Sequence, residues 1–118
     1  MTDFIQSGQR TIQMETDAVK ELSSRIGLSF VTACETILSC RGRVVVIGMG
    51  KSGHIGNKIA ATLASTGTPA FFVHPGEASH GDLGMITKGD VVVAISNSGN
   101  TSEIVTLIPL IVRLGIPL

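Results

Sequence analysis

The chain has 118 residues, and its nine basic and nine acidic side chains give a formal net charge of zero at neutral pH. This balance provides no electrostatic attraction for nucleic acid or for an anionic membrane surface, and no apolar run approaches the ~20 residues that a transmembrane helix needs. The length fits one small domain, and 43% apolar residues with 14 glycines are typical of an α/β domain.

The N-terminal residues and the cysteines favour a cytoplasmic location. The first residues, Met1 to Phe4, lack the basic region and the apolar stretch of a signal peptide. Cys34 and Cys40 have neither redox-motif nor zinc spacing. Reduced thiols in a cytosolic protein, without a metal, are the expected state.

The first 42 residues predict a helical segment that belongs to the same domain as the rest of the chain, residues 1–118. Apolar side chains recur at loosely helical spacing over residues 3–24. Ser29 is the predicted N-cap of a second helix that runs to Cys40.

From residue 43 onward, the pattern predicts alternating strands and helices. The expected strands cover 43–47, 70–73 and 90–95, the expected helices cover about 54–65 and 101–114, and residues 74–89 are expected to form a loop. Such alternation predicts a doubly wound parallel sheet of flavodoxin-like type. In the strand order 2-1-3, the carboxyl ends of the first and third strands border a crevice. Residues 116–118 look like the approach to a fourth strand, so the sheet is expected to be incomplete.

The first turn, Gly48–Gly53, matches the pattern G-x-G-x-x-G, which often binds dinucleotides. That interpretation needs an acidic residue at the end of the second strand, and no acid occurs there before Glu77. A triphosphate loop would place its first glycine at Val45, which also fails. The remaining interpretation is an anion site at a helix start, to which Lys51 adds a positive charge.

The turn after the third strand is rich in hydroxyl groups. Residues 96–101, Ser-Asn-Ser-Gly-Asn-Thr, contain three hydroxyls and a glycine. One hydroxyl would be an ordinary helix N-cap, which leaves the others unexplained. Neutral donors at a helix start suit a phosphate monoester and need no metal.

Titratable residues gather near these turns. Glu103 lies in the first turn of the last helix, either as a favourable dipole contact or as a base directed into the crevice. The segment 74–82 contains two histidines and two acids. It is a candidate catalytic loop. A metal site is also conceivable there, but no helical His-x-x-x-His pattern supports it.

Three segments together, GMGKSGHIG (48–56), STGTPAFFVHPGEASHGDLGMI (65–86) and ISNSGNTSEI (95–104), resemble the sugar isomerase (SIS) domain of arabinose 5-phosphate isomerases. The resemblance covers nearly the whole chain. It implies interconversion of D-ribulose 5-phosphate and D-arabinose 5-phosphate, the first step toward the acid sugar Kdo of lipopolysaccharide and some capsules. It also implies a cytoplasmic homo-oligomer, typically a tetramer, that uses no cofactor.

The resemblance also assigns residues. The implied catalytic positions are Lys51, His80 and Glu103, and the implied substrate-binding positions are Ser52, Glu77, Ser96, Asn97, Ser98 and Thr101. Family members continue for about as long again within the domain, supply another glutamate and a histidine there, and often carry CBS domains. Residues 1–118 therefore resemble an incomplete SIS domain.

Isomerisation of a ketose phosphate through an enediol requires a base, a proton relay and positive charge near the developing oxyanion. We expect Glu103 to be the base, Lys51 to stabilise the enediolate and phosphate charge, and His80 to open the ring or relay a proton. The alternative is a non-catalytic sugar-phosphate sensor, which would keep the serine turn without needing all three of these residues. Their joint presence favours the enzyme.

Overall fold

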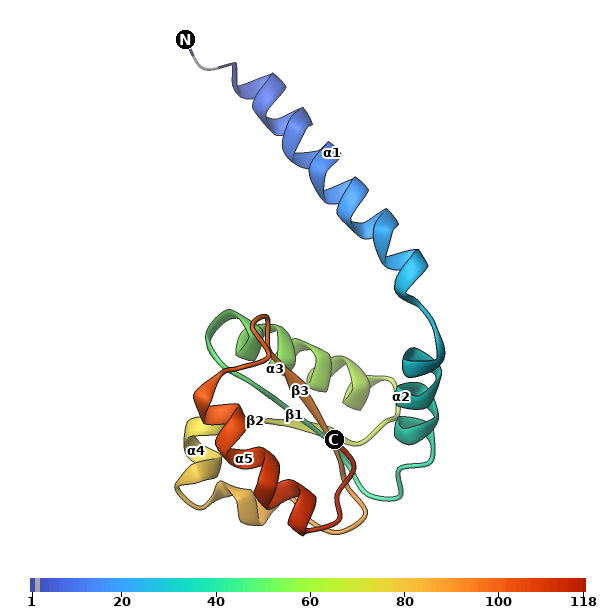
Figure 1. The fold of residues 1–118 in the computed structure, drawn as a ribbon, viewed down its shortest axis with the longest axis vertical. Coiled ribbons are helices and arrows are strands. Elements are labelled where there is room, and N and C mark those ends of the chain that lie inside the picture. Colours follow the sequence, from blue (N-terminus) through green and yellow to red (C-terminus); the bar gives the residue numbers. More distant parts are fainter. Residues whose placement is uncertain (2) are drawn as a thin grey trace. The chain divides into compact units, whose positions relative to one another are not determined.

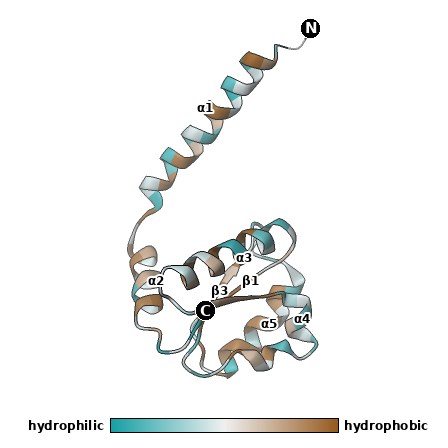
Figure 2. Ribbon diagram, turned by 180° about the vertical axis from the view of Figure 1, so that it is seen from behind, coloured by the Kyte–Doolittle hydropathy of each residue, from teal (hydrophilic) through white to brown (hydrophobic). Residues whose placement is uncertain are grey.

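A computed structural model describes residues 1 and 3–118, and the chain divides into two compact units, residues 1–35 and 36–118 (Figure 1). The first unit contains helix α1 (Phe4–Leu22), a 3-10 turn (Ser23–Arg25) and most of helix α2 (Leu28–Leu38). Asp3 caps α1, because its carboxylate accepts a hydrogen bond from the Gln6 N–H at 3.1 Å. No residue of α1 is buried, and brown apolar bands alternate with teal polar ones along it (Figure 2).

The predicted bounds of the second helix were wrong at both ends. The Val31 N–H donates to the Gly27 carbonyl, so the first helical turn closes ahead of Ser29, which lies inside α2 and is not its N-cap. The helix ends at Leu38 rather than at Cys40. None of the described helices, which cover residues 1 and 3–118, combines the length and hydropathy needed to cross a bilayer.

The second unit is built on a three-stranded parallel sheet in the order β2-β1-β3, which confirms the predicted strand order. The strands are β1 (Val44–Gly48), β2 (Ala70–Val73) and β3 (Val91–Ile95). Every residue of β1 is buried. A central strand covered on both faces explains its unbroken run of β-branched side chains.

Helices cover both faces of this sheet (Figure 1). Helix α3 (Gly50–Ser65) packs on one face, and α4 (Pro75–Ser79) with α5 (Ser102–Arg113) packs on the other. Successive strand residues point to opposite faces. The core on the α3 face contains Val44, Val46 and Ala60, and the core on the α5 face contains Val45, Ile47, Val73, Ala78, Ile86, Val92, Ile104, Leu107, Ile111 and Ile116.

Helix α3 begins at Gly50, four residues before the predicted start at His54, so most of the expected glycine-rich turn is the first turn of this helix. The Gly53 N–H already donates to the Met49 carbonyl at 3.2 Å. A Cβ atom on Gly53 would lie 2.6 Å from the Gly48 oxygen and 3.3 Å from the Phe72 ring. The glycine therefore lets the helix start directly against the end of β1.

The segment 74–89 is more ordered than the expected loop. It contains α4 and a 3-10 segment, Asp82–Met85. His74 caps α4 and Pro75 occupies the first helical turn, where a missing N–H costs nothing. Ala78 on α4 reaches the core beside α5. The Val92 N–H of β3 donates to the Pro117 carbonyl at 2.9 Å, so the last residues run beside β3.

Candidate functional site

The sheet topology brings the two predicted turns to one edge. Gly48 of β1 lies opposite Ile95 of β3 in parallel register, so both connections leave the carboxyl edge of neighbouring strands. The helices that follow cover opposite faces of the sheet. In a doubly wound sheet, this change of side at adjacent strands is where ligands bind.

The serine turn is closed by its own hydroxyl groups. Ser96 Oγ accepts a hydrogen bond from the Gly99 N–H at 3.0 Å and lies 2.8 Å from Thr101 Oγ1. Ser98 Oγ accepts a bond from the Asn100 N–H at 3.1 Å. A hydroxyl has one donor and two acceptor sites. The Ser98 proton, and one of the two shared by Ser96 and Thr101, therefore stay available to donate to a ligand. Asn97 belongs to the same turn and is exposed.

Glu103 follows this turn, in the first turn of α5, with its carboxylate exposed. Its own backbone N–H, the Ser102 hydroxyl at 3.0 Å and the charge on His74 hold the pKa of Glu103 below its ordinary value, against a small opposing effect of burial. The group is thus a carboxylate at neutral pH, which is the protonation state that a general base needs. Ser102 was not among the predicted site residues, although it directly follows the predicted serine turn, residues 96–101.

Lys51 and Ser52 lie in the first turn of α3, with Lys51 exposed and Ser52 half-buried. The N–H groups of a first helical turn have no partner within the helix. The positive end of the helix dipole also makes this an unfavourable place for an ammonium group. A bound anion would satisfy the N–H groups and relieve this repulsion.

Two further predicted residues lie on α4 and at its C-terminal end, and α4 packs against α5. Glu77 is exposed within α4, and His80 is the exposed residue that follows its last turn. No hydrogen bond joins Lys51, His80 and Glu103 to one another within residues 1 and 3–118. Lys51 and Glu103 each lie in the first turn of a helix that follows a strand ending at the same edge of the sheet, and His80 lies at the end of α4.

The structure draws attention to His74, which the sequence analysis did not include among its site residues. His74 follows β2 directly, and its Nδ1 accepts a hydrogen bond from the Gly76 N–H at 3.1 Å. It is also the histidine whose charge acts on Glu103. The signal for it in the sequence was its place in the segment 74–82, whose two histidines and two acids made it a candidate catalytic loop.

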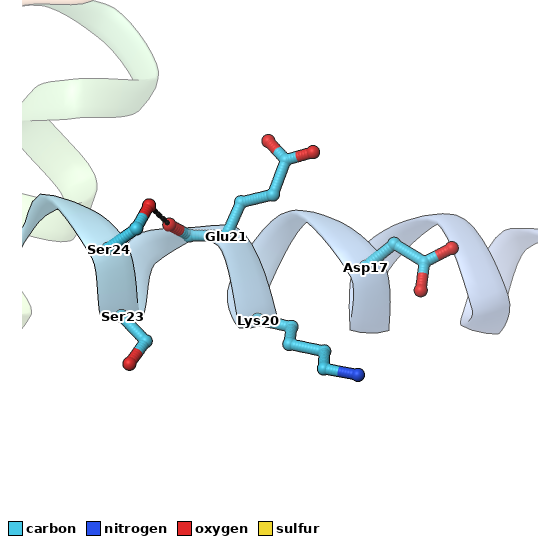
Figure 3. Close-up of a pocket in the computed structure, with 5 residues that line it drawn as sticks. All are labelled: Asp17, Lys20, Glu21, Ser23 and Ser24. Carbon is cyan, nitrogen blue, oxygen red and sulfur yellow. Dashed lines mark hydrogen bonds between the residues drawn. The ribbon is translucent and has the colours of Figure 1, made fainter.

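A surface hollow elsewhere in the chain does not contain these residues. It lies at the end of α1 and is lined by Asp17, Lys20, Glu21, Ser23 and Ser24. Figure 3 shows the Glu21 carboxylate and the Lys20 amine on opposite sides of the helix, and the hydrogen bond drawn there runs from Ser24 Oγ to the Glu21 carbonyl. Its polar groups do not converge, so it is a shallow feature of the helix surface. Among residues 1 and 3–118, no group of three or more metal-binding side chains is suitably clustered for an ion.

Comparison with known proteins identifies the family of this chain. A family model described as "SIS domain" matches residues 37–118. Arabinose 5-phosphate isomerase KdsD of Pseudomonas aeruginosa is 73% identical over 116 residues, which are 98% of this chain and 36% of that protein. The protein of the same name from Escherichia coli K12 is 60% identical, over 98% of this chain and 35% of its own length.

A solved structure has the same fold. A protein of E. coli CFT073 in complex with arabinose 5-phosphate superposes with a TM-score of 0.91 at 47% identity, over 98% of this chain and 63% of that one. The chain spans about a third of the length of the curated relatives that it matches. By the family model, its sequence relatives and its fold, the chain belongs to the SIS domain family.

Proposed function

We propose that this chain is part of an aldose–ketose isomerase that interconverts D-ribulose 5-phosphate and D-arabinose 5-phosphate. The observation that carries the proposal is the pair of anion-type turns on neighbouring strands, with Lys51 after one and Glu103 after the other. The name of the curated relatives and the solved structure with bound arabinose 5-phosphate support the same substrate. Because the chain spans about a third of those relatives, we assign turnover to the longer protein.

The proposed roles follow from the chemistry of each group. The hydroxyls of the serine turn, with Asn97 and Ser52, bind the phosphate, and Glu77 contacts the sugar. Glu103 moves the carbon-bound proton, Lys51 stabilises the enediolate and phosphate charge, and His80 opens the ring or relays a proton. No cofactor takes part in these steps.

The wider setting is also a proposal. The relatives carry the name of an isomerase whose product feeds Kdo synthesis for lipopolysaccharide. On that basis we place the protein in the cytoplasm, as a homo-oligomer of tetrameric type. Its partners are the sugar phosphate and further copies of itself.

The test is isomerisation in D₂O, followed by NMR. In an enediol path the proton held by Glu103 can exchange with solvent before it returns, so part of the D-arabinose 5-phosphate formed from D-ribulose 5-phosphate should carry deuterium at C2. The full natural protein should form it without added nucleotide or metal. Binding of the sugar phosphate without turnover would favour the non-catalytic sensor, and absence of both binding and turnover would reject the proposal. Measured hydride transfer to NAD would also overturn it.

A further inference from the structure

We propose that Ser102 is a positioning residue for the base: its hydroxyl group holds the Glu103 carboxylate in place while that carboxylate takes the carbon-bound proton of the sugar. The inference rests on the proposed isomerase function and deepens it, because Ser102 belongs neither to the predicted catalytic residues nor to the predicted phosphate ligands. The contact is direct, since the Ser102 hydroxyl donates to Oε2 of Glu103 at 3.0 Å.

The start of α5 leaves the Ser102 hydroxyl for this task. Thr101 is the N-cap residue, but among the residues that the structure describes its hydroxyl pairs with Ser96 Oγ, at 2.8 Å, and makes no cap hydrogen bond. The Ser98 hydroxyl accepts from the Asn100 N–H, so it also belongs to the turn. Ser102 carries the next hydroxyl along the chain, and this one bonds the acidic side chain.

The helix fixes the backbone that carries both side chains. The N–H groups of Ile104 and Val105 donate to the Thr101 carbonyl at 3.0 and 2.9 Å, which closes the first turn of α5. Ile104 is buried in the core on the α5 face, whereas Ser102 and Glu103 are exposed. The hydrogen bond from Ser102 therefore restricts the rotamers of a long side chain that would otherwise turn in solvent.

A hydrogen bond to one oxygen does not prevent a carboxylate from acting as a base. Its two oxygens offer about four acceptor sites, of which the Ser102 hydroxyl and the Glu103 N–H use two, so a site remains for the proton. A general base must lie within hydrogen-bond reach of the proton that it removes, and a displacement of about 1 Å can cost about 10²-fold in rate. Ser102 thus acts through the geometry of Glu103 and does not itself have to touch the sugar.

The same bond helps to keep Glu103 ionised. The backbone N–H of Glu103 is the first cause of its lowered pKa, the Ser102 hydroxyl is the second, and the charge on His74 adds to them. The other charged groups on α4, on the segment after it and in the first turn of α3 are Glu77, His80, Asp82 and Lys51. All of these remain in a Ser102→Ala variant, so a rise in the pKa of Glu103 there reports the lost hydroxyl.

The experiment compares Ser102→Ala with Ser102→Thr in the full natural protein. Ser102→Ala should lower kcat and kcat/KM together by roughly tenfold, toward the lower end for a hydrogen bond to a charged group, because both side chains are exposed. Ser102→Thr keeps a hydroxyl on the same carbon and should recover most of the lost kcat. Thr106→Val is the control for a structural effect on this turn. It removes a hydroxyl that bonds the Ser102 carbonyl, and it should keep wild-type kcat.

The pH dependence separates positioning of the base from a structural effect. Loss of a donor to a carboxylate raises its pKa, so the acid limb of the kcat/KM profile should move to higher pH in Ser102→Ala and return in Ser102→Thr. Carbodiimide coupling followed by peptide mapping needs no turnover. At one mildly acidic pH, Glu103 should be labelled faster in Ser102→Ala than in the wild type, because more of it is protonated. Glu77 should be labelled at the same rate in both.

Several results would overturn the inference. Wild-type kcat in Ser102→Ala is one, and an equal loss of kcat in Thr106→Val is another. A loss of kcat that shifts neither the acid limb nor the labelling rate would make the role structural. A change confined to KM and to competition by inorganic phosphate would make Ser102 a phosphate ligand. A wild-type protein that fails to interconvert the pentose phosphates would instead reject the proposed function, and the labelling of Glu103 would still test the contact.

Discussion

Among residues 1 and 3–118, Asp90 is the buried charged residue, with 1% exposure, and it connects the start of β3 to the start of β1. Its carboxylate accepts hydrogen bonds from the backbone N–H groups of Arg43 at 2.7 Å and Thr87 at 2.8 Å, and the Arg43 guanidinium lies 3.4 Å away. Burial raises the pKa of Asp90, but these donors outweigh it and leave the pKa lowered. Asp90 is thus satisfied as an ion.

Replacing Asp90 should therefore weaken the fold in a pH-dependent way. Asp90→Asn should lower the unfolding free energy by about 1–3 kcal/mol near neutral pH. The amide has only one oxygen, so one of the two backbone N–H donors would face an NH₂ group and lose its acceptor. A lowered folded-state pKa means that the ionised group stabilises the fold above its unfolded pKa, and that this contribution disappears as the pH falls through the folded pKa. Urea unfolding of both proteins at several pH values should show the difference shrinking toward acid.

The exposed Asp17, which accepts a bond from Gln13 Nε2 on α1, provides the control. Asp17→Asn should change stability by less than about 0.5 kcal/mol at any pH, as is usual for surface substitutions. A stability gap for Asp90→Asn that grows toward acid would contradict the assigned sign.

Ser98 tests the phosphate site. Ser98→Ala should weaken binding of D-arabinose 5-phosphate by roughly 1.5–3 kcal/mol, the range for a hydrogen bond to a charged group. Calorimetric titration measures it. Thr62→Ala removes a hydroxyl that bonds only the Lys58 carbonyl on α3, and it should leave affinity unchanged. Unchanged affinity in Ser98→Ala would remove the serine turn from the site.

Lys51 and Glu103 test the catalytic assignment. In the full natural protein, Lys51→Ala and Glu103→Gln should each reduce turnover by about 10²-fold or more, the scale of electrostatic and acid–base groups. Lys58 is exposed two turns further along α3. Lys58→Ala removes the same charge away from the site, so it is the control for Lys51→Ala and should keep wild-type turnover. Near-normal turnover in either site variant would exclude that residue from the mechanism.

At the scale of elements, the close contact between α3 and the end of β1 depends on Gly53, which has no side chain. Gly53→Ala would force its Cβ against the Gly48 carbonyl, which is backbone and cannot rotate away. We expect a loss of about 1–3 kcal/mol in unfolding free energy, the usual cost of overpacking. Gly8→Ala in α1 is the same substitution where a Cβ meets nothing within 4 Å, and there it should stabilise the helix by about 0.5–1 kcal/mol. Thermal unfolding followed by circular dichroism compares the two variants. If both substitutions changed the stability in the same direction, the packing argument would be refuted.

At the scale of the whole molecule, apolar surface stays uncovered in both units. In the first unit, Phe4 and Ile12 on α1 are 81% and 68% exposed. In the second unit, Ala94 on β3 is exposed. Within the described chain, β1 is the strand that pairs with β3, and the Val92 N–H of β3 also bonds the Pro117 carbonyl. A strand edge that is only partly paired and an apolar helix stripe both favour association.

We therefore expect residues 1–118 alone to self-associate increasingly as the protein concentration rises, and to show no isomerase turnover. Size-exclusion chromatography with light scattering, run beside the isomerase assay, measures both. Ile12→Asp with Val19→Asp should reduce the association if α1 drives it. A monodisperse monomer at high concentration would contradict the prediction, as would full turnover by this chain.

Much of the fold could be predicted from the chain itself because its strongest signals are local. The β-branched runs at 44–47 and 91–93 and the glycine and serine turns predicted the parallel sheet and its order. Boundaries were less accurate: α3 begins four residues early because Gly53 permits close contact with Gly48, a contact between elements that no local pattern reveals.

The candidate site also combines features that local sequence predicts with features that depend on tertiary contacts. The sequence by itself determined which residue types follow the strands, and from these it predicted the site: the hydroxyls of the serine turn, Lys51 and Glu103. Only the tertiary structure decided that those hydroxyls first close their own turn, and that the Gly76 N–H binds the His74 ring. The physical reason is that hydrogen-bond partners and charge effects depend on distance in space, which strand order and helix packing determine.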